Sequence, residues 1–252
     1  MPAYRATALP GDATFPLALI EEVVAEAGAG ERRRRLLPAA AVMVFVLGCC
    51  LFCGEGYGEV ARKLAGWLAP LAGPARWQVP GTSALAKARR RLGARPFELL
   101  FARLAGPLAG PGTPGAHAFG RLLAAIDGTT LDVAYTPANL AAFGPPPRGR
   151  EAGGFPQARV VTLAGCGTRG LADAVFAART GKGTSEQALA RQIAARGRLG
   201  RGMLVLADRN FCGHPVVAAL TATGADVLIR LKSSQVMPVI EALPDGLSLI
   251  HI

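Results

Sequence analysis

Two aspartates stand where apolar stretches of the chain give way to polar or glycine-rich residues. Asp127 lies in "LLAAIDGTT" (122–130) and Asp208 lies in "MLVLADRNF" (203–211). A carboxylate at the end of an apolar run is costly to bury unless something pairs with it. Each run predicts a buried strand, and ligand sites in layered α/β sheets assemble at strand ends. We expect the two aspartates to meet across neighbouring strands; the alternative is that each begins a turn or caps a helix.

A divalent cation would make such a pair of carboxylates stable, because two negative charges held close together repel each other. Magnesium favours hard oxygen ligands and keeps waters or substrate phosphates in its remaining positions. Two metal ions about 3.5–4 Å apart can activate an attacking oxygen and stabilise a leaving one in phosphoryl transfer. The two motifs therefore predict metal-assisted chemistry on a phosphate-containing substrate.

The charge of the chain favours a polyanionic partner. Lysine and arginine number 28 against 17 aspartates and glutamates, which gives a net charge of +11 over 252 residues. Such an excess is typical of proteins that bind nucleic acid or an anionic membrane surface. The alternative is an arginine-rich composition without a functional meaning. Apolar residues make up 51% of the chain, so we expect a folded core rather than disorder.

The cysteines indicate reduced thiols rather than a metal site or disulfides. There are five, and three of them crowd into "LGCCLFC" (47–53). No second cysteine pair or nearby histidines complete a zinc-binding pattern. We expect buried thiols in a cytoplasmic protein, and no secretory signal.

One apolar stretch reaches the lower limit for a membrane span. Residues 36–53 contain no charge and follow four arginines at 32–35. Pro38 and a run of alanines weaken the apolar character, and an amphipathic helix follows directly. We therefore predict a buried core helix and keep a membrane helix as the alternative.

The N-terminal part of the chain reads as helical. We predict two helices over residues 36–69 and a further pair beginning near residue 83 and at Pro96, with Thr82 or Ser83 as a helix cap. Leu85, Ala88 and Leu92 share one face of the third helix. Its basic residues are either a binding surface or a solvated face.

The second part has an α/β pattern. A loop rich in glycine and proline at 107–117 predicts the boundary between domains 1–112 and 118–252. Beyond it we predict three strands with a hairpin turn at 165–170, a helix from Thr184 or Ser185 to Gly197, and then strand, helix and strand. This order predicts an α/β fold with a mixed sheet.

Taken together, these motifs resemble the insertion-sequence transposases of the IS4 group. The apolar and amphipathic helices at 38–68 and the segment "VPGTSALAKARRRLGARPFELLFARLAG" (79–106) resemble their N-terminal helical domain. "AIDGTTLDVAYTPANLAAFG" (125–144) and "GMLVLADRNFCG" (202–213) resemble their two aspartate motifs, and "DVLIRLKSS" (226–234) resembles the strand that follows. The resemblance implies a ribonuclease H-like domain with a catalytic triad of two aspartates and a glutamate, preceded by an all-helical domain.

The resemblance also implies roles for individual residues. Asp127 and Asp208 are the first two acids of the triad, with Mg²⁺ or Mn²⁺ as cofactor. Arg209 and Asn210 are expected beside the second acid, where they hold substrate or support the metal ligands. Arg230 and Lys232 are expected on one face of a strand. The residues expected to contact DNA are Lys87, Arg89, Arg90, Arg91, Arg209, Arg230 and Lys232.

One part of the family pattern has no counterpart in this sequence. The third acid belongs to a "YxxRxxxExxK" pattern, and the residues after Asp208 contain no such pattern. We do not assign Glu241 to this role, because it stands in a different context. We expect a fragment cut inside the insertion that precedes the third acid. The predicted function is a DNA transposase, inactive as this fragment and a homo-oligomer in its full-length form; the alternative is a DNA-binding regulator without catalysis.

Overall fold

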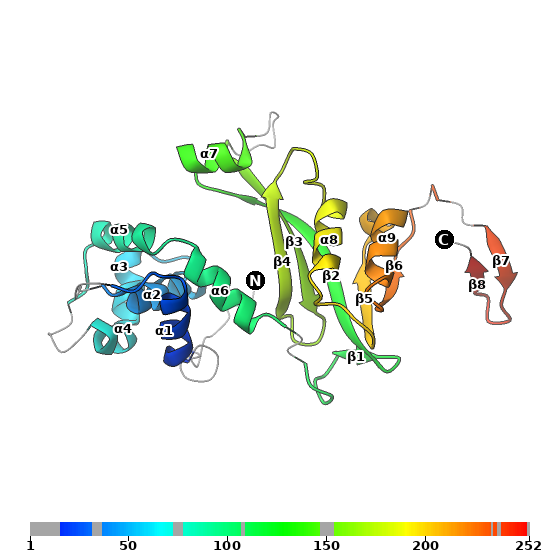
Figure 1. Cartoon of the computed structure of the whole chain (residues 1–252), viewed down its shortest axis with the longest axis horizontal. Coiled ribbons are helices and arrows are strands. Elements are labelled where there is room, and N and C mark those ends of the chain that lie inside the picture. The colour runs from blue at the N-terminus through cyan, green and yellow to red at the C-terminus, as the bar shows by residue number, and fades with distance from the viewer. Residues whose placement is uncertain are drawn as a thin grey trace. The chain divides into compact units, whose positions relative to one another are not determined.

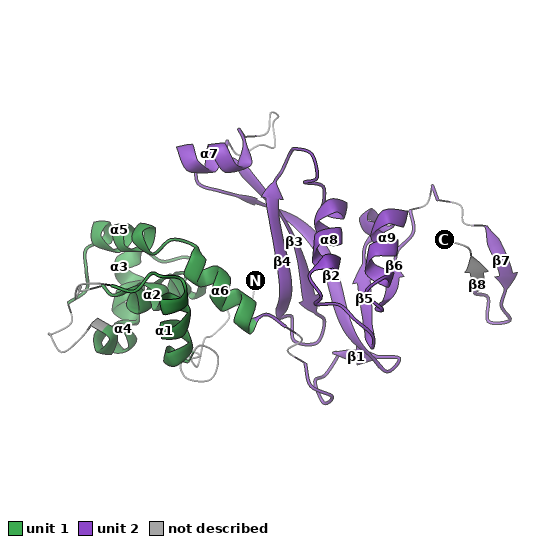
Figure 2. Cartoon of the chain, in the orientation of Figure 1, with its two compact units in different colours: residues 1–104 green, residues 105–252 purple. Residues whose placement is uncertain are grey.

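The computed structural model describes residues 16–31, 37–72, 78–106, 109–146, 154–232, 234–235 and 238–250. The chain divides into two compact units, residues 1–104 and residues 105–252 (Figure 2). The division falls just before the loop at 107–117 that the sequence marks as a boundary. Each unit has its own apolar core.

The described part of the first unit is helical. Its helices are α1 (Leu17–Glu26), α2 (Ala39–Leu51), α3 (Tyr57–Lys63), α4 (Ala65–Ala72), α5 (Thr82–Leu92) and α6 (Arg95–Leu104). Helix α2 supplies the centre of the core, where Met43 and Phe45 are fully buried. The prediction of a buried core helix in this apolar stretch is confirmed. No described helix combines the length and the apolar character that crossing a membrane requires.

Two details of this unit differ from the sequence predictions. Residues 36–69 were predicted as two helices, but they contain α2, α3 and most of α4, because the chain leaves helical geometry around Gly56 and again at Leu64. The predicted cap of α5 is also wrong. Gly81 occupies the cap position, and neither threonine nor serine side chain caps the helix. The buried face of α5, with Leu85, Ala88 and Leu92, is confirmed.

The second unit is built on a mixed sheet in the order β4-β3-β2-β5-β6, with β1 paired to β2 (Figure 1). Strand β2 is antiparallel to β3 and parallel to β5, and β5 is parallel to β6. Parallel neighbours require a crossover, which helix α9 provides between β5 and β6. The predicted mixed α/β class is confirmed, and the arrangement fits a ribonuclease H-like fold. The strands and helices are β1 (His117–Ala118), β2 (Arg121–Asp132), α7 (Pro137–Phe143), β3 (Gln157–Gly165), β4 (Leu171–Ala178), α8 (Glu186–Ala195), β5 (Met203–Ala207), the 3-10 helix η1 (Arg209–Phe211), α9 (His214–Thr221), β6 (Asp226–Ile229), and a separate pair, β7 (Val239–Ala242) and β8 (Ser248–Ile250).

Helix α8 begins and ends where the sequence predicts. The Ser185 side chain caps its first turn by accepting a hydrogen bond from the backbone N–H of Ala188 at 3.2 Å. Gly197, with φ of +72°, follows the last turn in the left-handed conformation that favours glycine. Leu189 and Ile193 are buried in the same core as the inner face of the sheet, so α8 is fixed against β3 and β4.

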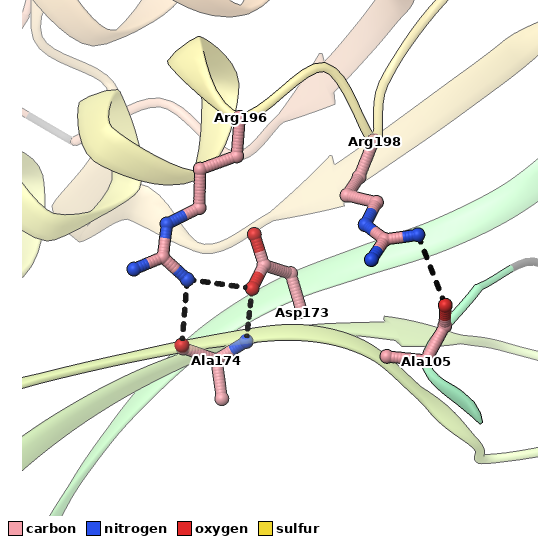
Figure 3. A network of polar contacts seen from close by, with 5 residues as sticks. All are labelled: Ala105, Asp173, Ala174, Arg196 and Arg198. Atoms are coloured by element: carbon pink, nitrogen blue, oxygen red, sulfur yellow. Dashed lines mark hydrogen bonds and ion pairs between the residues drawn. The ribbon is translucent and has the colours of Figure 1, made fainter. Parts of the chain in front are cut away.

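A buried carboxylate ties the end of α8 to the sheet (Figure 3). Asp173 of β4 is 5% exposed, and its Oδ1 accepts hydrogen bonds from Arg196 at 2.9 Å and from the backbone N–H of Ala174 at 2.8 Å. Two residues further on, Arg198 donates to the Ala105 carbonyl at 3.0 Å. Because a buried charge is stable only when it is paired, Asp173 depends on Arg196.

Two strands differ in length from the sequence predictions, and both differences affect the site. The sequence predicted that β2 ends at Asp127, but the strand continues through Asp132 because β3 pairs with it along its full outer half. Strand β6 ends at Ile229. Arg230 and Lys232 therefore follow the strand. The prediction that they alternate on one of its faces is wrong.

Candidate active site

The register of β2 against β5 brings the two aspartates next to each other. The last residue pair of this parallel ladder joins Ile126 to Ala207, and each aspartate is the next residue in its chain. Neighbouring strands lie about 4.8 Å apart, so the two backbones are within one strand spacing at this point. Both side chains are exposed. Residues far apart in sequence thus present two solvent-accessible carboxylates at one place on the sheet.

Each carboxylate is oriented by a backbone N–H of its own motif. Asp127 Oδ1 accepts a hydrogen bond from the N–H of Gly128 at 2.7 Å, and Asp208 Oδ1 accepts one from the N–H of Asn210 at 2.8 Å. Within the described residues, the structure gives the second oxygen of either group no hydrogen-bond donor. One oxygen of each aspartate therefore remains free to accept from a ligand.

The aspartate of β2 faces away from helix α8. Ile126 and its partner Leu163 are buried in the core beneath α8, and side chains alternate between the two faces of a strand. Asp127 and its partner Thr162 therefore lie on the opposite face. On the α8 side, the next residue of the strand is Gly128, which lies against the Glu186 side chain.

The donor set of this pair suits a hard divalent cation. Carboxylate oxygens are the ligands that magnesium and manganese prefer, and magnesium is commonly bound by one or two protein carboxylates together with waters and phosphates. Among the described residues, no group of three or more histidine, cysteine, aspartate or glutamate side chains is arranged to hold a metal. Asp127 and Asp208 thus offer two ligands.

Basic residues come just after the strands β5 and β6, at the end of the sheet that carries the two aspartates. The β5–β6 ladder ends at the pair Ala207–Ile229, so Arg230 is the register neighbour of Asp208. Arg209, Arg230 and Lys232 are all exposed. The sheet thus brings three sequence-predicted residues, Asp127, Asp208 and Arg230, to the ends of two adjacent parallel ladders, β2–β5 and β5–β6.

The basic cluster on α5 does not act as one group. Arg91 donates to the Leu37 carbonyl at 2.7 Å, and Arg89 lies over the Tyr57 ring, 5.7 Å from its centroid. Both contacts are within the first unit, so these two arginines help to hold it together. Lys87 and Arg90 are exposed, and the described residues provide no ion pair for either of them.

Two residues beside the predicted site, Glu186 and Gln187, were not expected from the sequence. Glu186 accepts a hydrogen bond from the Asn210 side chain, and Gln187 donates to the Asn210 carbonyl at 2.7 Å. Both stand in the first turn of α8, where a glutamate is common because it interacts favourably with the helix dipole. The sequence pattern alone therefore gave no reason to connect them with Asp208.

The described cysteines are unpaired, and one of them, Cys212, lies close in sequence to Asp208. All five are free thiols, and Cys212 is buried beside η1. Burial raises the pKa of the Cys49 thiol and of the Cys166 thiol, which keeps both protonated near neutral pH. The prediction of buried thiols is correct only for Cys212, because Cys49 and Cys166 are partly buried and Cys50 and Cys53, at the end of α2 and just after it, are exposed.

Comparison with known proteins assigns the family. Residues 12–102 match the insertion element 4 transposase N-terminal family, and residues 118–245 match the transposase DDE domain family. Transposase InsG for insertion sequence element IS4 of Escherichia coli (strain K12) is 29% identical over 209 residues, which are 82% of this chain and 44% of the relative. The chain therefore spans less than half the length of this curated relative.

A solved structure also aligns with most of the chain. It is a cryo-EM structure of the piggyBac transposase synaptic complex with hairpin DNA. The alignment covers 87% of this chain and 48% of that chain, with 11% identity and a TM-score of 0.46. On the two family matches, this chain belongs to the DDE transposases of the IS4 family.

Proposed function

We propose that the chain is a DNA transposase that binds transposon ends and takes part in metal-dependent DNA cleavage and strand transfer. The observation that supports this most directly is the β2–β5 register, which makes Asp127 and Asp208 neighbours within the part that matches the DDE domain.

Asp127 and Asp208 would hold the metal, Mg²⁺ or Mn²⁺. When bound, such an ion activates the attacking oxygen and stabilises the leaving oxygen of a phosphodiester. The protein's own part is to keep both carboxylates in place, each through a backbone N–H on Oδ1, and to leave their outer oxygens accessible. This division of roles explains why both aspartates are exposed and yet fixed.

Basic side chains of both units would bind the DNA phosphates. In the first unit we assign this role to Lys87 and Arg90, which are exposed and have no ion pair among the described residues. In the second unit we assign it to Arg209, Arg230 and Lys232, which lie close in sequence to the ends of β5 and β6. Contacts of this kind hold DNA without reading its sequence.

We further propose that this 252-residue chain binds DNA but does not cut it unaided. A DDE site requires a third carboxylate. Among the described residues, no third metal-binding side chain joins Asp127 and Asp208. The chain was predicted to lack the third acid, and Glu241 lies in the separate β7–β8 pair. A regulator that binds DNA without catalysis is the alternative that the same experiment addresses.

A binding and nicking assay on the 252-residue chain tests these proposals. A short fluorescent DNA duplex reports binding, and a supercoiled plasmid with Mg²⁺ or Mn²⁺ reports cutting. We expect metal-independent binding of the duplex and no nicking above that of the Asp127→Asn variant. Nicking that depends on Asp127 would overturn the proposed inactivity, and the absence of any DNA binding would overturn the proposed function.

The salt dependence of binding tests the DNA contacts on α5. Each lost phosphate contact lowers the slope of log affinity against log salt by about 0.9, so Lys87→Ala with Arg90→Ala should lower it by about 1.8. Arg95→Ala is the matched control, because Arg95 is an exposed arginine of the same unit that pairs with Glu98. An unchanged slope in the double variant would remove α5 from the DNA-binding surface.

A further inference from the structure

The first turn of α8 contacts both aspartate motifs through Glu186. Its carboxylate accepts a hydrogen bond from Nδ2 of Asn210, which stands two residues after Asp208. Its side chain also lies against Gly128, the residue after Asp127. One side chain thus touches the neighbours of both acids, although the three segments are far apart in sequence.

Gly128 is a glycine because Glu186 occupies the space of its side chain. A Cβ built on Gly128 would lie 2.6 Å from Cδ of Glu186, 2.8 Å from its Cγ and 2.9 Å from its Oε1. Its backbone is not in the left-handed region, so the conformation of β2 does not require glycine here. The glycine of the "DGTT" motif therefore serves close packing of α8 on β2 rather than a turn.

Asn210 is held by three hydrogen bonds that link it to α8 and to Asp208. Its side chain donates to Glu186, its carbonyl accepts from Gln187 at 2.7 Å, and its backbone N–H donates to Asp208 Oδ1 at 2.8 Å. The N–H that orients the Asp208 carboxylate thus belongs to a residue that α8 holds from two other directions. A shift of Asn210 would move the carboxylate with it.

Helix α8 is a firm support for these contacts. Ser185 caps its first turn, Leu189 and Ile193 are buried in the core, and Arg196 at its other end pairs with the buried Asp173. A side chain in the first turn of such a helix has a fixed origin. Glu186 can therefore transmit the position of α8 to both motifs.

Glu186 acts from behind the site rather than inside it. Side chains alternate along β2, so the face of Gly128 that meets Glu186 is opposite to the face on which Asp127 lies. The strand backbone stands between the two carboxylates, and no group of three metal-binding side chains occurs among the described residues. This geometry argues against Glu186 as a third metal ligand.

We propose that Glu186 is a positioning residue that sets the relative position of Asp127 and Asp208 through Gly128 and Asn210. The proposal rests on the proposed function only in taking these aspartates as the metal ligands. Partners that orient metal ligands in this way commonly change metal affinity by about 10–100-fold when removed.

A donor–acceptor exchange tests the hydrogen bond. Asn210→Asp keeps the size of the side chain but sets a second carboxylate against Glu186. Glu186→Gln keeps an acceptor for Asn210. The double variant Glu186→Gln with Asn210→Asp restores the bond with its direction reversed, because glutamine then donates to the aspartate, and it has the same net charge as the wild-type pair.

Two readouts on the 252-residue chain are needed. Amide hydrogen exchange at residue 210 without metal reports how firmly the segment is held. Mn²⁺ binding, measured by electron paramagnetic resonance of the free ion, reports the consequence for the aspartates. Gln192→Glu is the control for an added negative charge, because Gln192 is exposed on the same helix, and circular dichroism reports the fold.

The expected results form a pattern that a general loss of stability would not produce. Asn210→Asp should speed exchange at residue 210 and weaken Mn²⁺ binding by about 10–100-fold. Glu186→Gln should remain within about threefold of wild type, since a neutral hydrogen bond replaces a charge-assisted one. The double variant should recover most of the loss, and Gln192→Glu should change neither readout.

The proposal is overturned if the double variant is as impaired as Asn210→Asp, or if Asn210→Asp leaves exchange at residue 210 unchanged. Should Asn210→Asp unfold the second unit, Glu186→Ala compared with Glu186→Gln gives the same decision, with loss expected only for alanine. Mn²⁺ binding that is indifferent to Asp127→Asn would refute the metal site of the proposed function. The exchange data, taken without metal, would still decide the role of Glu186.

Discussion

Replacing Gly128 by alanine should displace Glu186 and destabilise the second unit. The new Cβ would lie 2.6 Å from Cδ of Glu186, well inside van der Waals contact. Because the glutamate is the flexible partner, we expect it to rotate away and to lose the hydrogen bond from Asn210. Hydrogen bonds to charged groups contribute about 1.5–3 kcal/mol, and Glu186 is only partly buried, so we expect a loss of about 1.5 kcal/mol.

The assay must report the second unit alone. Both tryptophans, Trp67 and Trp77, precede residue 105 in the sequence, so tryptophan fluorescence would not report on the second unit. Native-state hydrogen exchange of the β2 and β5 amides measures the opening free energy of the second unit directly. Gly200→Ala is the matched control, since a Cβ at Gly200 meets no atom within 4 Å; its effect should stay within about 0.5 kcal/mol.

A second substitution separates steric displacement from a general effect of alanine. In a Glu186→Ala background the space above Gly128 is empty, so Gly128→Ala should cost much less there. We expect a coupling free energy of at least about 1 kcal/mol between the two substitutions. Additive effects would refute the packing of Glu186 on Gly128.

Three further predictions concern stability and reactivity elsewhere in the chain. Asp173→Asn should lower the opening free energy of the second unit by about 1–3 kcal/mol in native-state exchange, because it weakens the ion pair that fixes the end of α8. Arg91→Ala should destabilise the first unit by about 1 kcal/mol in urea unfolding followed by tryptophan fluorescence, whereas Arg90→Ala should leave its stability unchanged. Alkylation at pH 8 followed by mass spectrometry should modify Cys49 more slowly than Cys50, because burial raises the pKa of the Cys49 thiol and lowers its thiolate fraction.

Local signals in the sequence were sufficient for the class of the fold and for several element ends. Apolar runs marked the inner strands, and Ser185 and Gly197 marked the limits of α8, because caps and left-handed glycines act within a few residues. The full length of β2 could not be predicted. Its outer half is stabilised by pairing with β3, and such long-range pairing leaves no signal in the polar residues after Asp127.

The two aspartate motifs of the site could be predicted from the sequence, but the contacts around them could not. The likeness of the two stretches around Asp127 and Asp208 led to the expectation that they are neighbours, and the β2–β5 register agrees with it. The role of each aspartate stays a prediction. Glu186 could not be found from sequence, because its contact with Gly128 depends on how α8 packs on the sheet. Arg91 was predicted to contact DNA together with its neighbours on the helix. Its hydrogen bond to the Leu37 carbonyl could not be foreseen, because that bond depends on the tertiary fold.

We propose that Asp127 and Asp208 together hold a divalent cation. A crystal of the 252-residue chain soaked in Mn²⁺ tests it through the anomalous signal of the metal. We expect a manganese peak roughly 2.0–2.3 Å from an oxygen of each aspartate, and its loss in the Asp208→Asn variant. A peak bound by other residues, or two carboxylates that point away from each other at saturating Mn²⁺, would contradict it.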